Sequence, residues 1–266
     1  MSRPVAAWRP PLLWRALLVV ARLVVAALSR LRVTGDVPEH LRRGPLVLAV
    51  NHVSPFDPVV LAAACRARRV APRIMATGGL FTAPLVGMLM RMCGHIRVDR
   101  GRATVTQALH TAAVAVAEGS VVAGYPEGRI GLDPGLWPER GRTGLARLAL
   151  ASGATVVPVA LWGPHEVLPY AAPKGLARAV LRAMWRRPVV RVAFGAPVDL
   201  GGLSAGRTGD ALRATDRVLD AVVATLRPLR EDEPDTPRYV DPTRPTSTAR
   251  SRPLPGSGPG PPGPAA

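Results

Sequence analysis

Short apolar runs alternate with stretches of helical pattern along most of the chain, and this alternation constrains the fold more than any other feature. We expect strands at residues 46–50, 70–76, 95–98, 120–125, 155–161 and 189–194. We expect helices at residues 58–67, 80–92, 102–118, 143–152, 174–187 and 209–227. Uninterrupted apolar runs of strand length are typical of parallel strands that are buried on both faces. The sequence therefore predicts an α/β fold with a largely parallel central sheet flanked by helices.

The first candidate site follows the apolar run at residues 46–50. His52 comes at the end of this expected strand, and Pro55 then makes the chain turn. Asp57 and Pro58 have the pattern of a helix start, with Asp57 as the N-cap and Pro58 in the first turn. A histidine and a carboxylate at this spacing can meet across the turn, and such a pair suits general-base chemistry. The alternative is a capping aspartate beside an unrelated surface histidine.

Two other expected strands also end in polar clusters. Residues 94–101 place Arg100 where a strand leaves the sheet, which suits recognition of a phosphate but also fits a solvated strand end. Glu127 lies between Pro126 and Gly128 after another apolar run, so it is either a fixed site residue or part of an ordinary turn. Ligands bind at the carboxyl edge of open α/β sheets. The three clusters can therefore converge on one site.

The charge of the chain is strongly positive and unevenly placed. The formal net charge is +17, and the excess gathers in residues 1–43 and 167–198, which are also rich in apolar residues. Basic, apolar segments favour an anionic membrane surface as partner. Nucleic acid is the competing partner. We do not expect it, because only 4% of residues are aromatic and no nucleic-acid-binding motif is present.

Residues 12–28 are apolar except for Arg15 and Arg22. The segment has three possible roles in a membrane: a transmembrane span, a signal peptide or a helix lying in the interface. Two central arginines bring the free energy of inserting this segment into a membrane close to zero. They also interrupt the apolar core that a signal peptide needs. We expect an interfacial helix with Trp8 and Trp14 as anchors. The alternative is an ordinary amphipathic helix packed on the domain.

The chain divides into three expected parts. These are a membrane-associating helix at residues 1–32, a catalytic domain at 33–227, and a tail at 228–266 that holds 11 of the 29 prolines. A segment of that composition cannot bury a core, and we expect it to be disordered. Cys65 and Cys93 lie in apolar stretches without a CxxC pattern, which indicates buried free thiols in a reducing compartment. The histidines and cysteines show no spacing typical of a metal site.

Four motifs in order resemble the glycerolipid acyltransferase family, which includes the 1-acylglycerol-3-phosphate acyltransferases. The pattern N-H-x-S-x-x-D is matched by Asn51, His52, Ser54 and Asp57, and G-x-I-x-V-D-R by Gly94, Ile96, Val98, Asp99 and Arg100. The pattern F-P-E-G-T-R is matched in part by Pro126, Glu127 and Gly128. The fourth motif, an apolar strand with a central proline, is matched at residues 156–159. The resemblance covers about residues 33–200.

The resemblance implies the fold of the glycerol-3-phosphate and lysophosphatidate acyltransferases. It implies that His52 takes a proton from an acceptor hydroxyl, with support from Asp57, while that hydroxyl attacks the thioester of acyl-CoA or acyl-carrier protein. No other cofactor is implied. The resemblance also implies a set of positions that bind substrate, namely Asn51, Ser54, Arg100, Glu127, Gly128 and Arg129. In the third motif Arg129 and Ile130 stand where threonine and arginine are usual, so the arginine is displaced by one residue.

The resemblance thus implies acyl transfer to a lysophospholipid, foremost 1-acylglycerol-3-phosphate, in phospholipid biosynthesis. With the basic, apolar segments, we expect a peripheral or monotopic protein at the cytoplasmic face of the cell membrane. Three alternatives stay open. One is an acyltransferase for a different lipid acceptor, and another is a thioesterase-like hydrolase, although G-x-S-x-G is absent. The third is a non-catalytic membrane-surface protein with the same fold.

Overall fold

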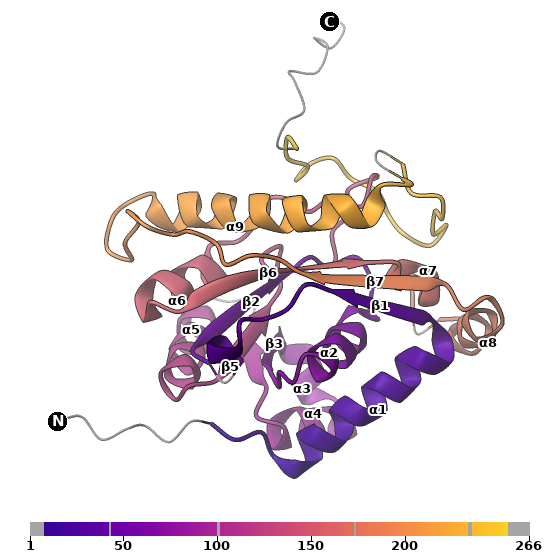
Figure 1. Cartoon of the computed structure of the whole chain (residues 1–266), viewed down its shortest axis with the longest axis horizontal. Coiled ribbons are helices and arrows are strands. Elements are labelled where there is room, and N and C mark those ends of the chain that lie inside the picture. Colours follow the sequence, from indigo (N-terminus) through magenta and orange to yellow (C-terminus); the bar gives the residue numbers. More distant parts are fainter. Residues whose placement is uncertain (1–7, 43, 100–101, 173, 234–235, 255–266) are drawn as a thin grey trace, which may run out of the picture.

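The computed structural model describes residues 8–42, 44–99, 102–172, 174–233 and 236–254, and for residues 102–105 the backbone alone. A seven-stranded sheet runs through the molecule in the order β1-β7-β6-β2-β5-β3-β4 (Figure 1). The strands are β1 (Arg30–Thr34), β2 (Leu46–Val50), β3 (Arg73–Thr77), β4 (Ile96–Val98), β5 (Val121–Gly124), β6 (Thr155–Trp162) and β7 (Val189–Phe194). All neighbouring strands pair in parallel except β6 with β7. The largely parallel sheet is therefore confirmed.

Helices cover both faces of the sheet. They are α1 (Leu12–Leu28), α2 (Asp57–Ala67), α3 (Gly78–Thr82), α4 (Pro84–Met92), α5 (Arg102–Ala117), α6 (Gly144–Ser152), α7 (Pro164–Val167), α8 (Leu176–Arg186) and α9 (Asp210–Leu226), with 3-10 turns η1 (Glu39–Leu41) and η2 (Arg227–Arg230). Alternate residues of β2 pack on opposite faces of the sheet. Leu48 packs with α1 and α2, and Val47 packs with α5, α6 and α9. Figure 1 shows α9 on one side of the sheet and α1 and α2 on the other. The apolar run of β2 is continuous because both of its faces are buried.

The structure differs from the expected elements most clearly at β1 and at the helix expected at residues 80–92, besides smaller shifts such as that of β3, which begins at Arg73, and the short helix α7, which was not expected. Residues 30–34 form β1, an edge strand with alternating exposed positions, so the boundary expected at residue 33 falls inside a strand. The helix expected at residues 80–92 is divided into α3 and α4 at Ala83, because Pro84 opens a new helix there.

Helix α1 packs on the domain through one face. Trp14 is buried, and its indole N–H donates to the carbonyl oxygen of Pro72 at 3.1 Å, so the expectation that Trp14 anchors a membrane is wrong. Trp8 also packs against the buried cluster. The opposite face of α1 leaves Leu12 and Leu23 exposed. Within the described residues, no helix is long and apolar enough to cross a membrane.

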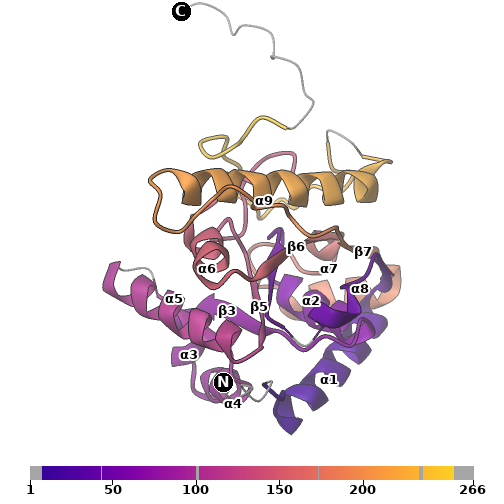
Figure 2. The same ribbon diagram turned by 60° about the vertical axis from the view of Figure 1, so that its left-hand side comes forward.

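The C-terminal segment at residues 236–254 lies against the domain rather than being disordered. Figures 1 and 2 show this yellow segment beside α9. Just before it, the guanidinium of Arg230 lies between two indole rings, 3.8 Å from the centroid of Trp137 and 4.3 Å from that of Trp162. The expectation of disorder failed for residues 236–254 because polar side chains bonded to distant loops, not apolar area, fix them in place. The expectation for residues 255–266 lies outside the described residues.

Candidate active site

A His–Asp pair forms at the end of β2. The Nδ1 atom of His52 lies 2.7 Å from Oδ2 of Asp57, a fully buried carboxylate. The same oxygen accepts hydrogen bonds from the backbone N–H groups of Val53 at 2.6 Å and Ser54 at 2.8 Å. A carboxylate held by two backbone donors orients the ring and favours a proton on Nδ1, which leaves Nε2 able to accept a proton. The arrangement is that of a general base with its supporting carboxylate.

Asp57 does not have the capping role that its position predicts. Helix α2 begins at Asp57 itself, Phe56 is the N-cap residue, and no side chain caps the helix. The carboxylate points back into the preceding turn and binds that turn instead of the helix N–H groups. Asp57 therefore shapes the loop that presents His52.

The ring of Tyr125 forms one wall of the site. It stacks on the imidazole of His52 with centroids 4.0 Å apart and an interplanar angle of 19°. Burial raises the pKa of Tyr125 well above its usual value, and the charge of Asp57 acts in the same direction. The side chain of His52 keeps 16% exposure. The base is thus fixed on one face by an aromatic ring and still reachable from solvent.

Asn51 and Ser54 hold the backbone rather than facing a substrate. The Asn51 amide donates to the Leu161 carbonyl at 3.0 Å and accepts from the Leu161 N–H at 2.7 Å, which extends the pairing of β2 with β6. The Ser54 hydroxyl lies 3.1 Å from the carbonyl oxygen of Pro164 and accepts from Phe56 N–H. Both side chains are 1% exposed. The expectation that they bind substrate is not supported by these contacts.

Glu127 connects the loop after β5 to the loop after β2. Its Oε1 accepts from the His52 N–H, and its Oε2 accepts from the Glu139 N–H, each at 3.0 Å. Burial raises the pKa of Glu127 to about 8. The two hydrogen bonds lower this pKa, and the charges of Glu139 and Asp57 raise it further. The side chain is 1% exposed. Glu127 therefore holds the backbone of His52, and both of its carboxylate oxygens are occupied by backbone N–H groups.

Arg129 is already paired. Its guanidinium donates to both carboxylate oxygens of Glu139 at 2.9 to 3.2 Å, and Glu139 is fully buried. Gly128 precedes it with φ of +70°, and a Cβ there would lie 2.9 Å from Cδ of Arg142, so the turn requires glycine. The displaced arginine of the third motif thus serves an internal ion pair. Arg100 lies outside the described residues.

Comparisons with known proteins identify the family and the fold of the chain. Residues 30–162, half of the chain, match the family model described as Acyltransferase. The chain belongs to the acyltransferase family. Relatives with sequence similarity include an uncharacterized protein of Mycobacterium leprae, 28% identical over 242 residues that cover 77% of this chain and 59% of the relative. An uncharacterized protein of Mycobacterium tuberculosis strain H37Rv is 28% identical over 222 residues, with 70% and 58% covered.

The acyltransferase chain spans about three fifths of the length of the curated relatives it matches. Among solved structures, it is similar to the 1-acyl-sn-glycerophosphate (LPA) acyltransferase PlsC from Thermotoga maritima, with a TM-score of 0.58 and 19% identity. That likeness covers 77% of this chain and 76% of the other. The fold expected from the motifs is therefore confirmed.

Some functional contacts of this acyltransferase have no signal in the sequence. Glu139 lies in a loop without a recognisable pattern, yet it binds Arg129 and accepts from the Leu132 N–H at 2.9 Å. Its partners are set by how the loop at residues 131–142 folds back on itself. An ion pair of this kind is found only once the tertiary structure is known.

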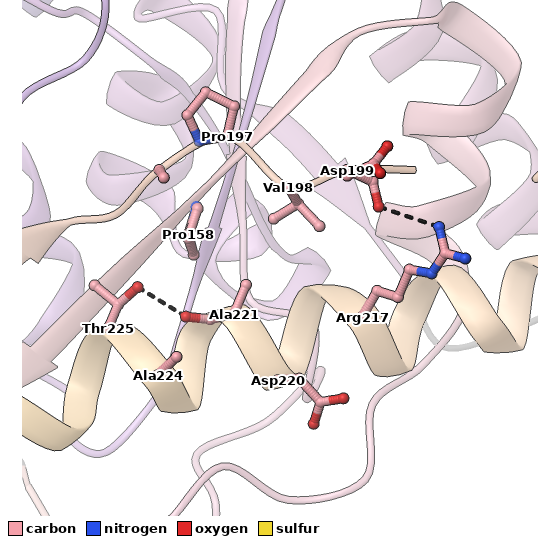
Figure 3. A pocket seen from close by; sticks show the side chains of 10 residues that line it. Pro158, Pro197, Val198, Asp199, Arg217, Asp220, Ala221, Ala224 and Thr225 are labelled. Carbon is pink, nitrogen blue, oxygen red and sulfur yellow. Dashed lines mark hydrogen bonds between the residues drawn. The ribbon is translucent and has the colours of Figure 1, made fainter. Parts of the chain in front are cut away.

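A hollow of about 420 Å³ between α9 and the chain after β7 is not the transfer site (Figure 3). Pro158, Val198 and Ala221 are among its lining residues, whereas His52 and Asp57 are not. The Thr225 hydroxyl at this hollow donates to the carbonyl of Ala221 within α9. The hollow therefore offers no pair of groups for acyl transfer.

Proposed function

We propose that this acyltransferase moves a fatty acyl group from acyl-CoA or acyl-carrier protein to a hydroxyl of a lysophospholipid, foremost 1-acylglycerol-3-phosphate. The observation that carries the proposal is the 2.7 Å contact between His52 Nδ1 and the buried carboxylate of Asp57, which two backbone N–H groups hold in place. This pair lies within the residues that match the acyltransferase family model.

The proposed reaction uses both residues of the pair. Nε2 of His52 takes the proton of the acceptor hydroxyl as the oxygen attacks the thioester carbonyl carbon. The tetrahedral intermediate then collapses, the carbon–sulfur bond breaks, and the leaving thiolate takes the proton from the imidazolium. The products are an ester and a free thiol, with no acyl-enzyme. Asp57 stabilises the imidazolium, and positioned proton transfer of this kind contributes roughly 10²–10⁴-fold.

Two arginines bear on whether the acceptor's head group carries a phosphate. Arg129 is committed to Glu139, so it is not free to bind a phosphate. Under the proposal Arg100 remains the residue that binds the acceptor phosphate. The pairing of Arg129 favours a second candidate function, acyl transfer to a lipid hydroxyl whose head group carries no phosphate.

An acyl transfer assay with the purified full chain tests both candidates. Radiolabelled acyl-CoA and acyl-carrier protein are each offered with 1-acylglycerol-3-phosphate and with the matched monoacylglycerol. Ester formation with the phosphorylated acceptor alone supports the first candidate, and ester formation with both acceptors supports the second. Release of free fatty acid at the same rate with and without any acceptor would show a thioesterase and overturn the proposal.

We also propose that the enzyme works while bound to an anionic membrane, at the cytoplasmic face of the cell membrane. Several helices expose large apolar side chains: Leu12, Val19, Val20, Leu23 and Val24 on α1, Leu85, Val86, Met88 and Met92 on α4, and Leu181, Met184 and Trp185 on α8. Trp185 is 90% exposed, and α8 also carries the exposed Arg178 and Arg186. Apolar side chains with arginines beside them fit an interface with anionic head groups.

Liposome sedimentation tests the membrane proposal. The protein is expected to sediment with phosphatidylglycerol vesicles more than with phosphatidylcholine vesicles and to be partly released by high salt, because salt screens the arginine charges. Trp185→Ser is expected to weaken sedimentation, whereas Leu212→Ser, at an exposed position on α9, is the matched control. Equal binding of both variants and both vesicle types would contradict the proposed surface.

A further inference from the structure

The C-terminal segment at residues 236–254 binds both loops of the active site. Arg244 donates through Nη1 to the carbonyl oxygen of Val53 at 2.7 Å and through Nη2 to the carbonyl oxygen of Gly131. The Gly131 N–H in turn donates to the carbonyl of His52 at 2.9 Å. One guanidinium therefore joins the loop that presents the catalytic histidine to the loop that follows Glu127.

Arg244 is itself held by its neighbours. Its N–H donates to the carbonyl of Asp241 at 3.1 Å, and the Asp241 carboxylate accepts from the N–H groups of Tyr170 and Thr243. The Thr243 hydroxyl also accepts from the Ala171 N–H at 3.1 Å. The short turn at residues 241–244 is thus attached to the chain that follows α7, and it directs the arginine at the two loops.

The rest of the segment runs along the second loop. The Ser247 N–H donates to the carbonyl of Leu132 at 2.8 Å, and the Arg140 N–H donates to the carbonyl of Arg250 at 2.8 Å. Arg250 donates from its side chain to the carbonyl of Glu127 at 3.1 Å. The loop at residues 127–142 therefore takes many of its hydrogen bonds from a segment that lies more than 100 residues away in sequence.

We propose that Arg244 is a positioning residue for the His52–Asp57 pair. This inference rests on the function proposed above, and it concerns a residue outside the part of the chain that matches the family model, residues 30–162. Arg244 acts through the Val53 and Gly131 carbonyls, and it does not touch the reacting atoms.

The charge of Arg244 suits this position. Three carboxylates lie close enough to act on it: burial lowers the pKa of Arg244, while Asp57, Asp241 and Glu127 raise it. Hydrogen bonds from a charged donor are roughly twice as strong as neutral ones. Removal of the guanidinium leaves two buried carbonyl groups without this donor and frees both loops to shift. A displacement of about 1 Å at catalytic groups costs about 10²-fold in rate.

The test compares Arg244→Ala with Arg238→Ala, an arginine of the same segment whose side chain lies near Glu233 and is 69% exposed. Arg244→Ala is expected to lower kcat by about 10- to 100-fold, with KM for donor and acceptor within about twofold, because positioning acts on the chemical step. Guanidinium chloride, at a concentration that leaves the wild type unchanged, is expected to restore part of the lost kcat. Arg238→Ala is expected to behave as the wild type.

Hydrogen–deuterium exchange gives a readout that does not need activity. In Arg244→Ala the amides of residues 52–54 and 131 are expected to exchange faster, and in Arg238→Ala they are expected to keep the wild-type rate. A normal kcat in Arg244→Ala overturns the proposal. The proposal is also overturned if kcat falls but guanidinium does not restore it and the exchange rates of these amides are unchanged. Failure of the wild type to transfer an acyl group would overturn the proposed function instead, and unchanged exchange in the variant would then overturn the positioning role.

Discussion

The two loops that build the site are held in different ways. In the loop after β2, Asp57 binds His52, Val53 and Ser54, all within five residues of it in sequence. In the loop after β5, the carbonyls of Glu127 and Gly131 accept from arginines that lie 123 and 113 residues away. The first loop is organised around one carboxylate of its own sequence, although Glu127 and Arg244 also bind it, whereas the second loop depends more on the C-terminal segment. Variants in each loop are therefore expected to fail differently.

The largest effect is expected at the centre of the first loop. His52→Ala removes the proposed base, and acyl transfer is expected to fall by about 10⁴-fold, at the upper end of what positioned proton transfer contributes. The melting temperature is expected to fall modestly, since the variant loses the stacking on Tyr125 and the contact with the buried carboxylate of Asp57. Steady-state acyl transfer and a thermal melt measure the two quantities. Activity near that of the wild type in this variant would remove His52 from the mechanism.

Two substitutions of Asp57 separate its effect on catalysis from its effect on the stability of the loop. Asp57→Asn keeps an oxygen that can accept from the Val53 and Ser54 N–H groups but loses the negative charge, so activity is expected to fall by about 10²–10³-fold with little change in stability. Asp57→Ala leaves both buried N–H groups unpaired, at about 1–3 kcal/mol each, and is expected to lower the free energy of unfolding as well. Urea unfolding of the two variants distinguishes these effects. Activity near that of the wild type in Asp57→Asn would assign Asp57 a purely structural role.

Truncation tests whether the second loop depends on the C-terminal segment. A chain ending after Arg230 loses the hydrogen bonds of Arg244, Ser247 and Arg250 to the loop, so kcat is expected to fall by about 10- to 100-fold and the melting temperature by several degrees. A chain ending after Leu254 keeps those bonds and is the matched control. If the shorter chain keeps the activity and the melting temperature of the wild type, the segment is dispensable, as its composition predicts.

Local patterns predicted most of the fold and the first loop. The strands and helices whose apolar period is clear were found, because their signal lies within each element. Strand β1 was missed because its sequence, Arg30-Leu31-Arg32-Val33-Thr34, alternates arginines with apolar residues at a sheet edge and so does not look buried. The contact of His52 with Asp57 was found because the turn between them is short.

The same reasoning failed where contacts are distant. Asn51 and Ser54 were expected to bind substrate, but a buried amide and a buried hydroxyl that bond to backbone have the same sequence pattern as ones that face a ligand. The segment at residues 236–254 was expected to be disordered because composition measures apolar area. It is held by arginine, aspartate and threonine side chains that bind backbone groups more than 70 residues away, and no local pattern reports such bonds.

A smaller effect is expected from the ion pair of the second loop. Arg129→Ala leaves the buried carboxylate of Glu139 with only the more distant Arg250 guanidinium, at 3.8 Å, and the Leu132 N–H. The free energy of unfolding is expected to fall by about 1–3 kcal/mol. The acceptor's KM is expected to stay within about twofold, measured beside the unfolding curve. A large rise of KM for a phosphorylated acceptor alone would show that Arg129 binds the phosphate.

The last expected effect concerns stability alone, through the dependence of the free energy of unfolding on pH at Glu127. Burial raises the pKa of this carboxyl from 4.5 to about 8, so between these values the folded protein holds a proton that the unfolded chain has lost. Stability from this group is therefore fully present below about pH 4.5 and is lost as the pH rises toward 8. Glu127→Gln cannot titrate and is expected to flatten the curve of unfolding free energy against pH over that range, whereas Glu231→Gln, at an exposed carboxylate, is expected to leave it as in the wild type. An unchanged curve in Glu127→Gln would mean that the two backbone N–H groups bound to Glu127 keep it charged, and that the second loop is held by an anion as the first loop is by Asp57.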